Sequence, residues 1–191
     1  MGIQNVRRII LASASPRRKE ILSKLGVPFE IQVSTCDENI GVEDPSDMVE
    51  QLSKLKADDV AKRNPDALVI GADTVVSYGN SILGKPKDRE DAIGMIKMIS
   101  GHEHHVYTGV TIVIPGEDTV SFVESTCVKV AEMSDVEIER YVDSGEPMDK
   151  AGAYAIQGLF APYITGIEGD YYNVVGLPIA SVYSILKRYI F

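Results

Sequence analysis

Residues 9–20 read IILASASPRRKE, an apolar run that becomes a strongly basic segment within a few positions. The apolar half predicts a buried strand, and Ser15 followed by proline is typical of a helix N-cap with proline at the first helical position. Arg17, Arg18 and Lys19 then fall in the first helical turn, where the helix dipole is already positive. Each cation there is unfavourable by a few tenths to about 1 kcal/mol. The stretch therefore predicts a strand–helix junction that binds an anion.

The composition sets limits on the class of protein. A chain of 191 residues with 45% hydrophobic and 25% charged residues predicts one globular domain over residues 1–191, or two closely joined lobes. The net charge of −9 argues against a protein that coats nucleic acid. The absence of a long apolar run and of a basic leader predicts neither a membrane span nor a signal peptide, and two distant cysteines favour free thiols in the cytoplasm.

The order of hydrophobic patterns predicts an α/β fold with a mixed sheet flanked by helices. Cap residues such as Ser134 with Glu137, and breakers such as Gly145, bound several of the segments. Predicted strands cover 6–12, 29–34 and 67–72 and a long hairpin covers 105–114 and 119–130, with helices over 16–25, 46–63, 88–99 and 134–145 and a last helix that begins at Pro178.

Asp73 follows the apolar segment 67–72 directly, at the predicted carboxyl end of a strand, where open α/β sheets place ligands. A carboxylate beside an anion site repels the anion unless a divalent cation lies between them. Asp37 or Glu38, which follow the strand 29–34, could supply a second carboxylate. The alternative is that these acids only stabilise turns.

Two lysines are placed unusually. Lys56 occupies a position of the apolar stripe of its helix, four residues after Leu52 and four before Val60. It either extends past the edge of the core or points into a cleft at an anion. Lys85 precedes Pro86, which restricts the direction of its backbone.

The segment 148–158, MDKAGAYAIQG, combines small residues with the amide of Gln157. Small residues allow close approach to a ligand, and an amide can both donate to and accept from the edge of a base, although plain tight packing would use the same composition. His102, His104 and His105 lack a further ligand at a suitable spacing and do not favour a metal site.

Five ordered motifs together resemble the Maf family of nucleoside triphosphate pyrophosphatases, which is distantly similar in fold to the inosine triphosphatases. The resemblance runs through nearly the whole chain and implies an elongated central sheet with two lobes around a nucleotide cleft. The motifs are Ser13-Ala14-Ser15-Pro16-Arg17-Arg18, Gly71-Ala72-Asp73-Thr74, Gly84-Lys85-Pro86, Asp149 to Tyr154 continuing through Gln157-Gly158, and Gly169-Asp170-Tyr171 continuing through Asn173 to Gly176-Leu177-Pro178.

The resemblance also implies an activity and roles for individual residues. The activity is hydrolysis of a nucleoside triphosphate to the monophosphate and pyrophosphate, with Asp73 as the proton acceptor and Lys85 as a further catalytic residue. Glu38 and Asp73 would bind Mg²⁺ or Mn²⁺. Ser13, Arg17, Arg18, Lys56, Lys85 and Gln157 would bind the substrate.

The branch of the family that prefers dTTP and UTP is marked by Pro-Arg-Arg, Ala-Asp-Thr and Ile-Gln-Gly, which place Arg17, Thr74 and Gln157 at the specificity positions. The resemblance further implies a cytoplasmic homodimer with a house-cleaning role and no nucleic-acid or membrane partner. Two alternatives stay open: a non-catalytic nucleotide-binding regulator of septum formation, and a pyrophosphatase for 7-methyl-GTP or inosine-type nucleotides.

Overall fold

The junction of strand and helix at the start of the chain forms as predicted. In the computed structural model, which describes residues 7–190, Ile9–Ala12 is strand β1 and Pro16–Ser23 is helix α1. Ser15 is the N-cap of α1, and its hydroxyl accepts a hydrogen bond from the N–H of Arg18 at 3.5 Å. Val6, where the predicted strand began, lies outside the described residues.

The remaining elements alternate between helices and strands along the chain. The strands are β2 (Glu30–Ile31), β3 (Leu68–Tyr78), β4 (Ser81–Leu83), β5 (Glu103–Val113), β6 (Val120–Val130) and β7 (Ile164–Glu168). The helices are α2 (Pro45–Arg63), α3 (Arg89–Ile99), α4 (Asp135–Asp143), α5 (Tyr171–Val175) and α6 (Ile179–Ile190), with 3₁₀ helices η1 (Glu146–Asp149), η2 (Ala151–Ala153) and η3 (Ala161–Tyr163).

Most predicted helix boundaries are confirmed, because the capping groups act locally. Ser134 and Glu137 form the predicted capping box at the start of α4, and Asp88 caps α3. The predicted strand 29–34 is wrong in length. It pairs with β1 only over Glu30–Ile31, because β1 is only four residues long. One further hydrogen bond runs from the N–H of Gln32 to the carbonyl oxygen of Leu11.

The strands form one mixed sheet in the order β2-β1-β3-β5-β6-β7, with β4 paired to β3. The chain divides into two compact units. Unit 1 holds the described residues of Met1–Asp73, Thr108–Val123 and Gly176–Phe191, and unit 2 holds Thr74–Tyr107 and Glu124–Val175. In unit 1, β1 pairs in parallel with β2 and with β3. In unit 2, β4 pairs antiparallel with β3, and β7 pairs antiparallel with β6. The predicted mixed α/β class is confirmed.

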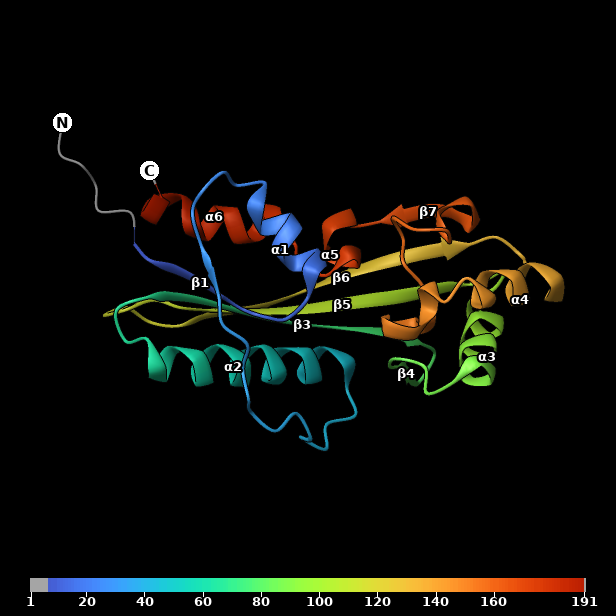
Figure 1. The fold of residues 1–191 in the computed structure, drawn as a ribbon, viewed down its shortest axis with the longest axis horizontal. Coiled ribbons are helices and arrows are strands. Elements are labelled where there is room, and N and C mark those ends of the chain that lie inside the picture. The colour runs from blue at the N-terminus through green and yellow to red at the C-terminus, as the bar shows by residue number, and fades with distance from the viewer. Residues whose placement is uncertain (1–6, 191) are drawn as a thin grey trace. The chain divides into compact units, whose positions relative to one another are not determined.

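Helix α2 packs unusually closely on the sheet in unit 1. It covers one face of the strands, and α1 and α6 lie on the other face (Figure 1). A Cβ on Gly71 of β3 would lie 2.4 Å from the carbonyl oxygen of Ser53, and a Cβ on Gly109 of β5 would lie 2.2 Å from the carbonyl oxygen of Val49. Both contacts are to the backbone of α2, so only glycine at these two positions permits this helix–sheet distance.

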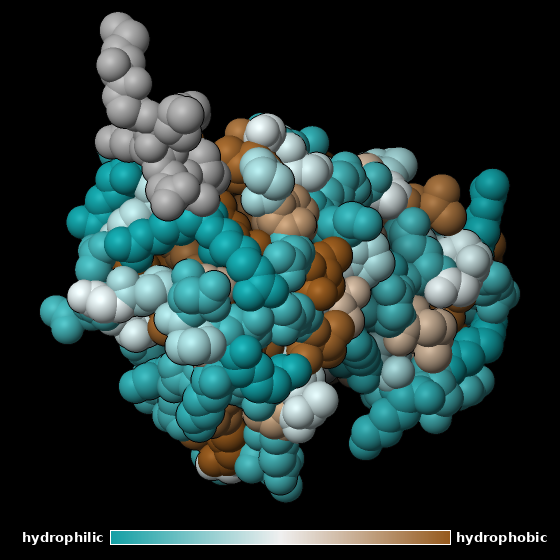
Figure 2. All heavy atoms as spheres, turned by 60° about the vertical axis from the view of Figure 1, so that its left-hand side comes forward, coloured by the Kyte–Doolittle hydropathy of each residue, from teal (hydrophilic) through white to brown (hydrophobic). Residues whose placement is uncertain are grey.

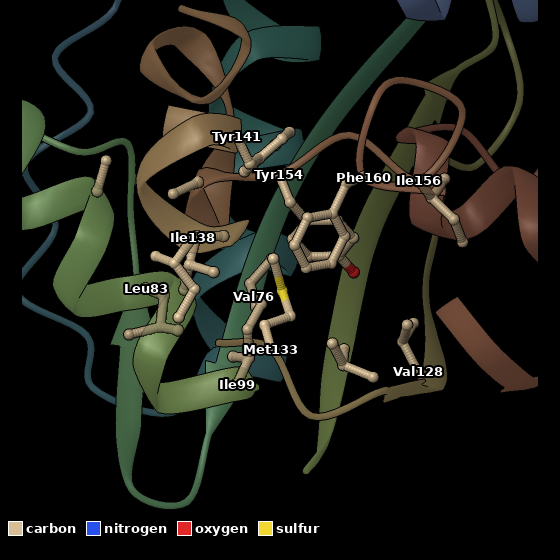
Figure 3. Close-up of a cluster of buried hydrophobic side chains, with 14 of the residues drawn as sticks. Val76, Leu83, Ile99, Val128, Met133, Ile138, Tyr141, Tyr154, Ile156 and Phe160 are labelled. Atoms are coloured by element: carbon tan, nitrogen blue, oxygen red, sulfur yellow. The ribbon is translucent and has the colours of Figure 1, made fainter. Parts of the chain in front are cut away.

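Unit 2 has its own hydrophobic core, built largely from α3, α4 and the aromatic residues that follow η2. Phe160 lies at its centre and is fully buried, with ring centroids 5.0 Å from Tyr141 and 4.9 Å from Tyr154 (Figure 3). Val76 and Val128 contribute from the strands of the same unit. These contacts fix the segment that contains Gln157, because buried side chains precede and follow it.

The face shown in Figure 2 is mainly hydrophilic, with small and scattered hydrophobic areas. None of the helices within residues 7–190 combines the length and the apolar character that crossing a membrane requires.

Replacing Gly109 by alanine is expected to destabilise the protein by about 1–3 kcal/mol or more, because the new methyl group would overlap the backbone of α2. Urea unfolding measures this free energy. Gly94→Ala is the matched control: Gly94 lies inside α3 with open space around its Cβ position, so alanine there should stabilise by about 0.5–1 kcal/mol. Equal effects of the two substitutions would contradict the close packing of α2.

His104 is a buried titratable group in unit 2. Only 1% of the residue is exposed, and its Nε2 lies 2.7 Å from the hydroxyl of Tyr154. Its Nδ1 has no hydrogen-bond partner among the described residues. Burial, with a smaller contribution from the charge of the neighbouring His105, lowers the pKa of His104 from 6.5 to about 4. The folded protein therefore holds this imidazole neutral.

The free energy of unfolding should fall by about 2 kcal/mol between pH 7 and pH 5 because of His104. The unfolded chain binds a proton at this histidine near pH 6.5, whereas the folded protein does so only near pH 4, so acid favours the unfolded chain within that window. Urea unfolding at both pH values should show the fall in the parent and in the control His105→Gln. In His104→Gln this decrease in the free energy of unfolding should be smaller by about 2 kcal/mol. A decrease equal to that of the parent would contradict the assignment to His104.

Candidate functional site

The ammonium group of Lys56 lies between two carboxylates in unit 1. Its Nζ is 2.6 Å from Oδ1 of Asp73 on β3 and 2.9 Å from Oε2 of Glu38. The side chains of Lys56 and Asp73 are only 12% and 14% exposed, whereas that of Glu38 is 57% exposed. Partial burial strengthens such charge pairs, because less water screens them. The lysine on the apolar stripe thus points at carboxylates rather than extending past the core.

Asp73 does not follow a strand, as the apolar pattern predicted, but lies inside β3, which continues to Tyr78. The prediction was wrong because the later residues pair with β4, a contact that the pattern of 67–72 does not reveal. The parallel pairing of β1 with β3 nevertheless ends at Ala12 and Gly71. Asp73 and Ser13 therefore both lie just beyond the carboxyl end of the parallel part of the sheet, where such folds place ligands.

Arg18 is directed by hydrogen bonds to the segments around it. Its Nε donates to the carbonyl oxygen of Gly176 at 2.8 Å, and its guanidinium donates to the hydroxyl of Ser13 at 3.3 Å. Burial lowers the pKa of Arg18, the charge of Asp73 opposes this and the charge of Arg17 adds to it. An arginine stays protonated despite such a shift, so the half-buried group is a permanent positive charge beside Asp73.

Glu38 is positioned by a residue that the sequence did not single out. Asp59 of α2 accepts hydrogen bonds from the N–H of Thr35 and from the hydroxyl of Ser34, both at 2.9 Å. These bonds, that of Thr35 first, lower the pKa of Asp59 and keep it charged. They tie the segment that carries Glu38 to the same helix that carries Lys56. An acid on the exposed side of a helix gives no sequence signal for this role.

Three predicted residues belong to unit 2. Thr74 follows Asp73 on β3 and is half-buried. Lys85 is exposed after β4, next to the buried Pro86. Gln157 is exposed in a turn between the buried residues Ile156 and Phe160. Their roles toward a substrate stay predictions.

The carboxylate oxygens around Lys56 are suitable ligands for a hard divalent cation. Glu38 and Asp73 present carboxylate oxygens to one point, and Mg²⁺ is commonly held by one or two carboxylates together with phosphates and water. Residues 7–190 contain no group of three or more His, Cys, Asp or Glu side chains arranged for a metal ion. Two carboxylates would leave the other ligand positions of such a cation to phosphate oxygens and water.

The fold resembles that of the Staphylococcus aureus Ham1 protein, with a TM-score of 0.53 and 14% sequence identity over 95% of this chain and 99% of that one. The predicted likeness in fold to the Ham1-like proteins is thereby confirmed.

Curated relatives are much closer in sequence. A protein of Lachnoclostridium phytofermentans is 48% identical over 95% of this chain and 95% of its own length. A protein of Bacillus cereus is 51% identical over 96% of each chain, and both are named dTTP/UTP pyrophosphatase. The Maf-like protein family matches residues 8–189. With its motifs, fold and relatives in agreement, this chain belongs to the Maf family.

Proposed function

We propose that this protein is a nucleoside triphosphate pyrophosphatase that hydrolyses dTTP and UTP to the monophosphate and pyrophosphate. The relatives that share about half of its residues over nearly their full length bear that name. The observation in the chain itself that carries the proposal is the convergence of Asp73, Glu38 and Lys56 beside the guanidinium of Arg18.

Each of these residues has a task that suits phosphoryl chemistry, which depends on positioning and charge neutralisation. Asp73, whose carboxylate is largely enclosed, accepts a proton from the attacking water. Arg17, Arg18 and Lys56 bind the triphosphate, with Ser13 as a neutral donor at the same helix start. Lys85 adds a further cation from its exposed position.

A divalent cation, Mg²⁺ or Mn²⁺, would be held by Glu38 and Asp73 and would neutralise charge on the phosphate oxygens. Lys56 already supplies positive charge to the same two carboxylates. The protein's own ammonium group and the metal ion therefore compete for one pair of acids. When a triphosphate is bound, its oxygens offer Lys56 a second set of acceptors.

Selectivity for the base is assigned to Arg17, Thr74 and Gln157, and the amide of Gln157 is suited to read the edge of a pyrimidine. We further propose a cytoplasmic homodimer without a nucleic-acid or membrane partner. The net charge of −9 supports the absence of nucleic acid, and the resemblance to the family supports the rest.

Asp73→Asn should lower kcat for dTTP by about 10²–10⁴-fold, because the amide cannot accept the proton, while nucleotide affinity changes little. Pyrophosphate release with Mg²⁺ and with chelator measures the rate, and calorimetry measures binding. Asp66→Asn is the control, since Asp66 is an exposed acid of the same unit.

Hydrolysis of dTTP at the parent rate by Asp73→Asn would contradict the assigned base. Binding without hydrolysis by the parent, across dTTP, UTP, dCTP, dITP and 7-methyl-GTP, would favour the non-catalytic regulator. Preferred hydrolysis of one of the last two would point to the other alternative.

Lys56→Gln should increase the affinity of the nucleotide-free protein for Mn²⁺ by about fivefold or more, because it removes a competing charge from between Glu38 and Asp73. Titration calorimetry with MnCl₂ alone measures this. Lys54→Gln is the matched control, as it removes one exposed cation from the same helix. Equal Mn²⁺ affinities in the two variants would show that Lys56 does not compete with the metal ion.

A further inference from the structure

The turn that presents Gln157 is built around the carboxylate of Glu146. The N–H of Leu159 donates to both carboxylate oxygens, at 3.0 and 2.9 Å. The hydroxyl of Tyr141 donates to Oε1 at 3.1 Å. One half-buried acid thus receives donors from the turn and from α4.

Gly158 fits the turn to this carboxylate. A Cβ added to Gly158 would lie 2.3 Å from Oε2 and 2.4 Å from Oε1 of Glu146. The backbone next to Gln157 therefore contacts the carboxylate so closely that a methyl group cannot be inserted without moving one of them. The three nearest atoms to that Cβ position all belong to Glu146, so the acid itself defines the space for the turn.

The two ends of the turn are held by the core. Ile156 is 6% exposed and Phe160 is fully buried, and Figure 3 shows both among the side chains of the unit 2 core together with Tyr141. Gln157 itself is exposed. Hydrophobic packing therefore anchors the flanks. The exposed middle is held by the hydrogen bonds to Glu146 together with a backbone bond from the N–H of Gly158 to the carbonyl oxygen of Ala155 at 3.0 Å.

Glu146 is in turn held from its own side. It begins η1 directly after Gly145, whose φ of +78° lies in the left-handed region that favours glycine. Its carbonyl oxygen accepts a hydrogen bond from Nζ of Lys150 at 3.3 Å. Burial, with the charge of Glu146 in addition, raises the pKa of Tyr141, so the phenol stays a donor to the carboxylate.

We propose that Glu146 is a positioning residue for selectivity: its carboxylate fixes the turn 157–159 so that the amide of Gln157 meets the base in one orientation. The proposal rests on the proposed function, in which Gln157 reads the base. A displacement of about 1 Å in a recognition group can cost up to about 10²-fold in rate, so a turn held by two or three hydrogen bonds is sufficient to govern discrimination.

The test compares the ratio of kcat/KM for dTTP to that for dCTP, two pyrimidine substrates with different hydrogen-bonding edges. Glu146→Ala should lower this ratio by about tenfold, mainly through loss of dTTP turnover at low substrate concentration. Glu146→Gln keeps an oxygen acceptor for the N–H of Leu159 and should recover part of the ratio, because a neutral acceptor forms a weaker bond than a carboxylate.

Gly158→Ala provides an independent variant. Its methyl group would displace the carboxylate, so it should lower the ratio to a similar extent as Glu146→Ala. The double variant should be no worse than either single variant, since the clash disappears with the side chain. Additive losses would contradict a shared cause.

A control separates selectivity from stability. Glu137→Ala removes the capping-box acid of α4 in the same unit, which costs about 1 kcal/mol without a contact to the turn. It should leave the ratio unchanged. If Glu146→Ala and Glu137→Ala lose equal stability and both keep the parent ratio, Glu146 is structural only and the inference is wrong. If the parent hydrolyses neither substrate, the proposed function itself fails.

Discussion

The close approach of α2 to the sheet is the constraint on which the candidate site depends. Gly71 allows the backbone of α2 at Ser53 and Ala57 to lie against β3. Lys56 immediately precedes Ala57, and Asp73 follows Gly71 by two residues, so the same contact that packs the core brings the ammonium to the carboxylate. A larger residue at Gly71 would move the helix outward and lengthen this ion pair. The absence of a side chain at Gly71 therefore determines both the helix–sheet packing and the ion pair between Lys56 and Asp73.

The basic start of α1 becomes understandable in the same terms. Cations at a helix N-terminus are unfavourable by themselves. Arg18 offsets part of this by donating to the carbonyl of Gly176 and the hydroxyl of Ser13, neither of which neutralises its charge. The opposite charge of Asp73 is nearby but is already paired with Lys56. A guanidinium at a helix start suits a triphosphate, whose several oxygens can accept from its planar set of N–H donors.

The sequence predicts those features that depend on residues close together in the chain. The N-cap at Ser15 and the capping box at Ser134 act over three residues, and both formed as predicted. The extension of β3 past Asp73 depends on pairing with β4 across a short turn, and the shortness of β2 depends on β1 earlier in the chain. The apolar pattern within each segment carries no information about either partner. The roles of Asp59 and Glu146 were missed for the same reason. Each binds backbone N–H groups 13 or more residues away in the chain.

Charge and selectivity place different demands on a nucleotide site. In the proposed function, Arg18 and Lys56 of unit 1 bind phosphate, which every nucleoside triphosphate carries, so these two cations add affinity without distinguishing one base from another. Discrimination requires a neutral donor and acceptor held in one direction, because an unpaired polar group is costly only if it cannot turn away. An exposed amide such as Gln157 has that freedom unless its backbone is fixed. The carboxylate of Glu146 lies between the turn and α4 and removes this freedom by fixing the backbone of the turn. In our proposal, an acid that does not contact the substrate thus helps to determine which substrate is chosen.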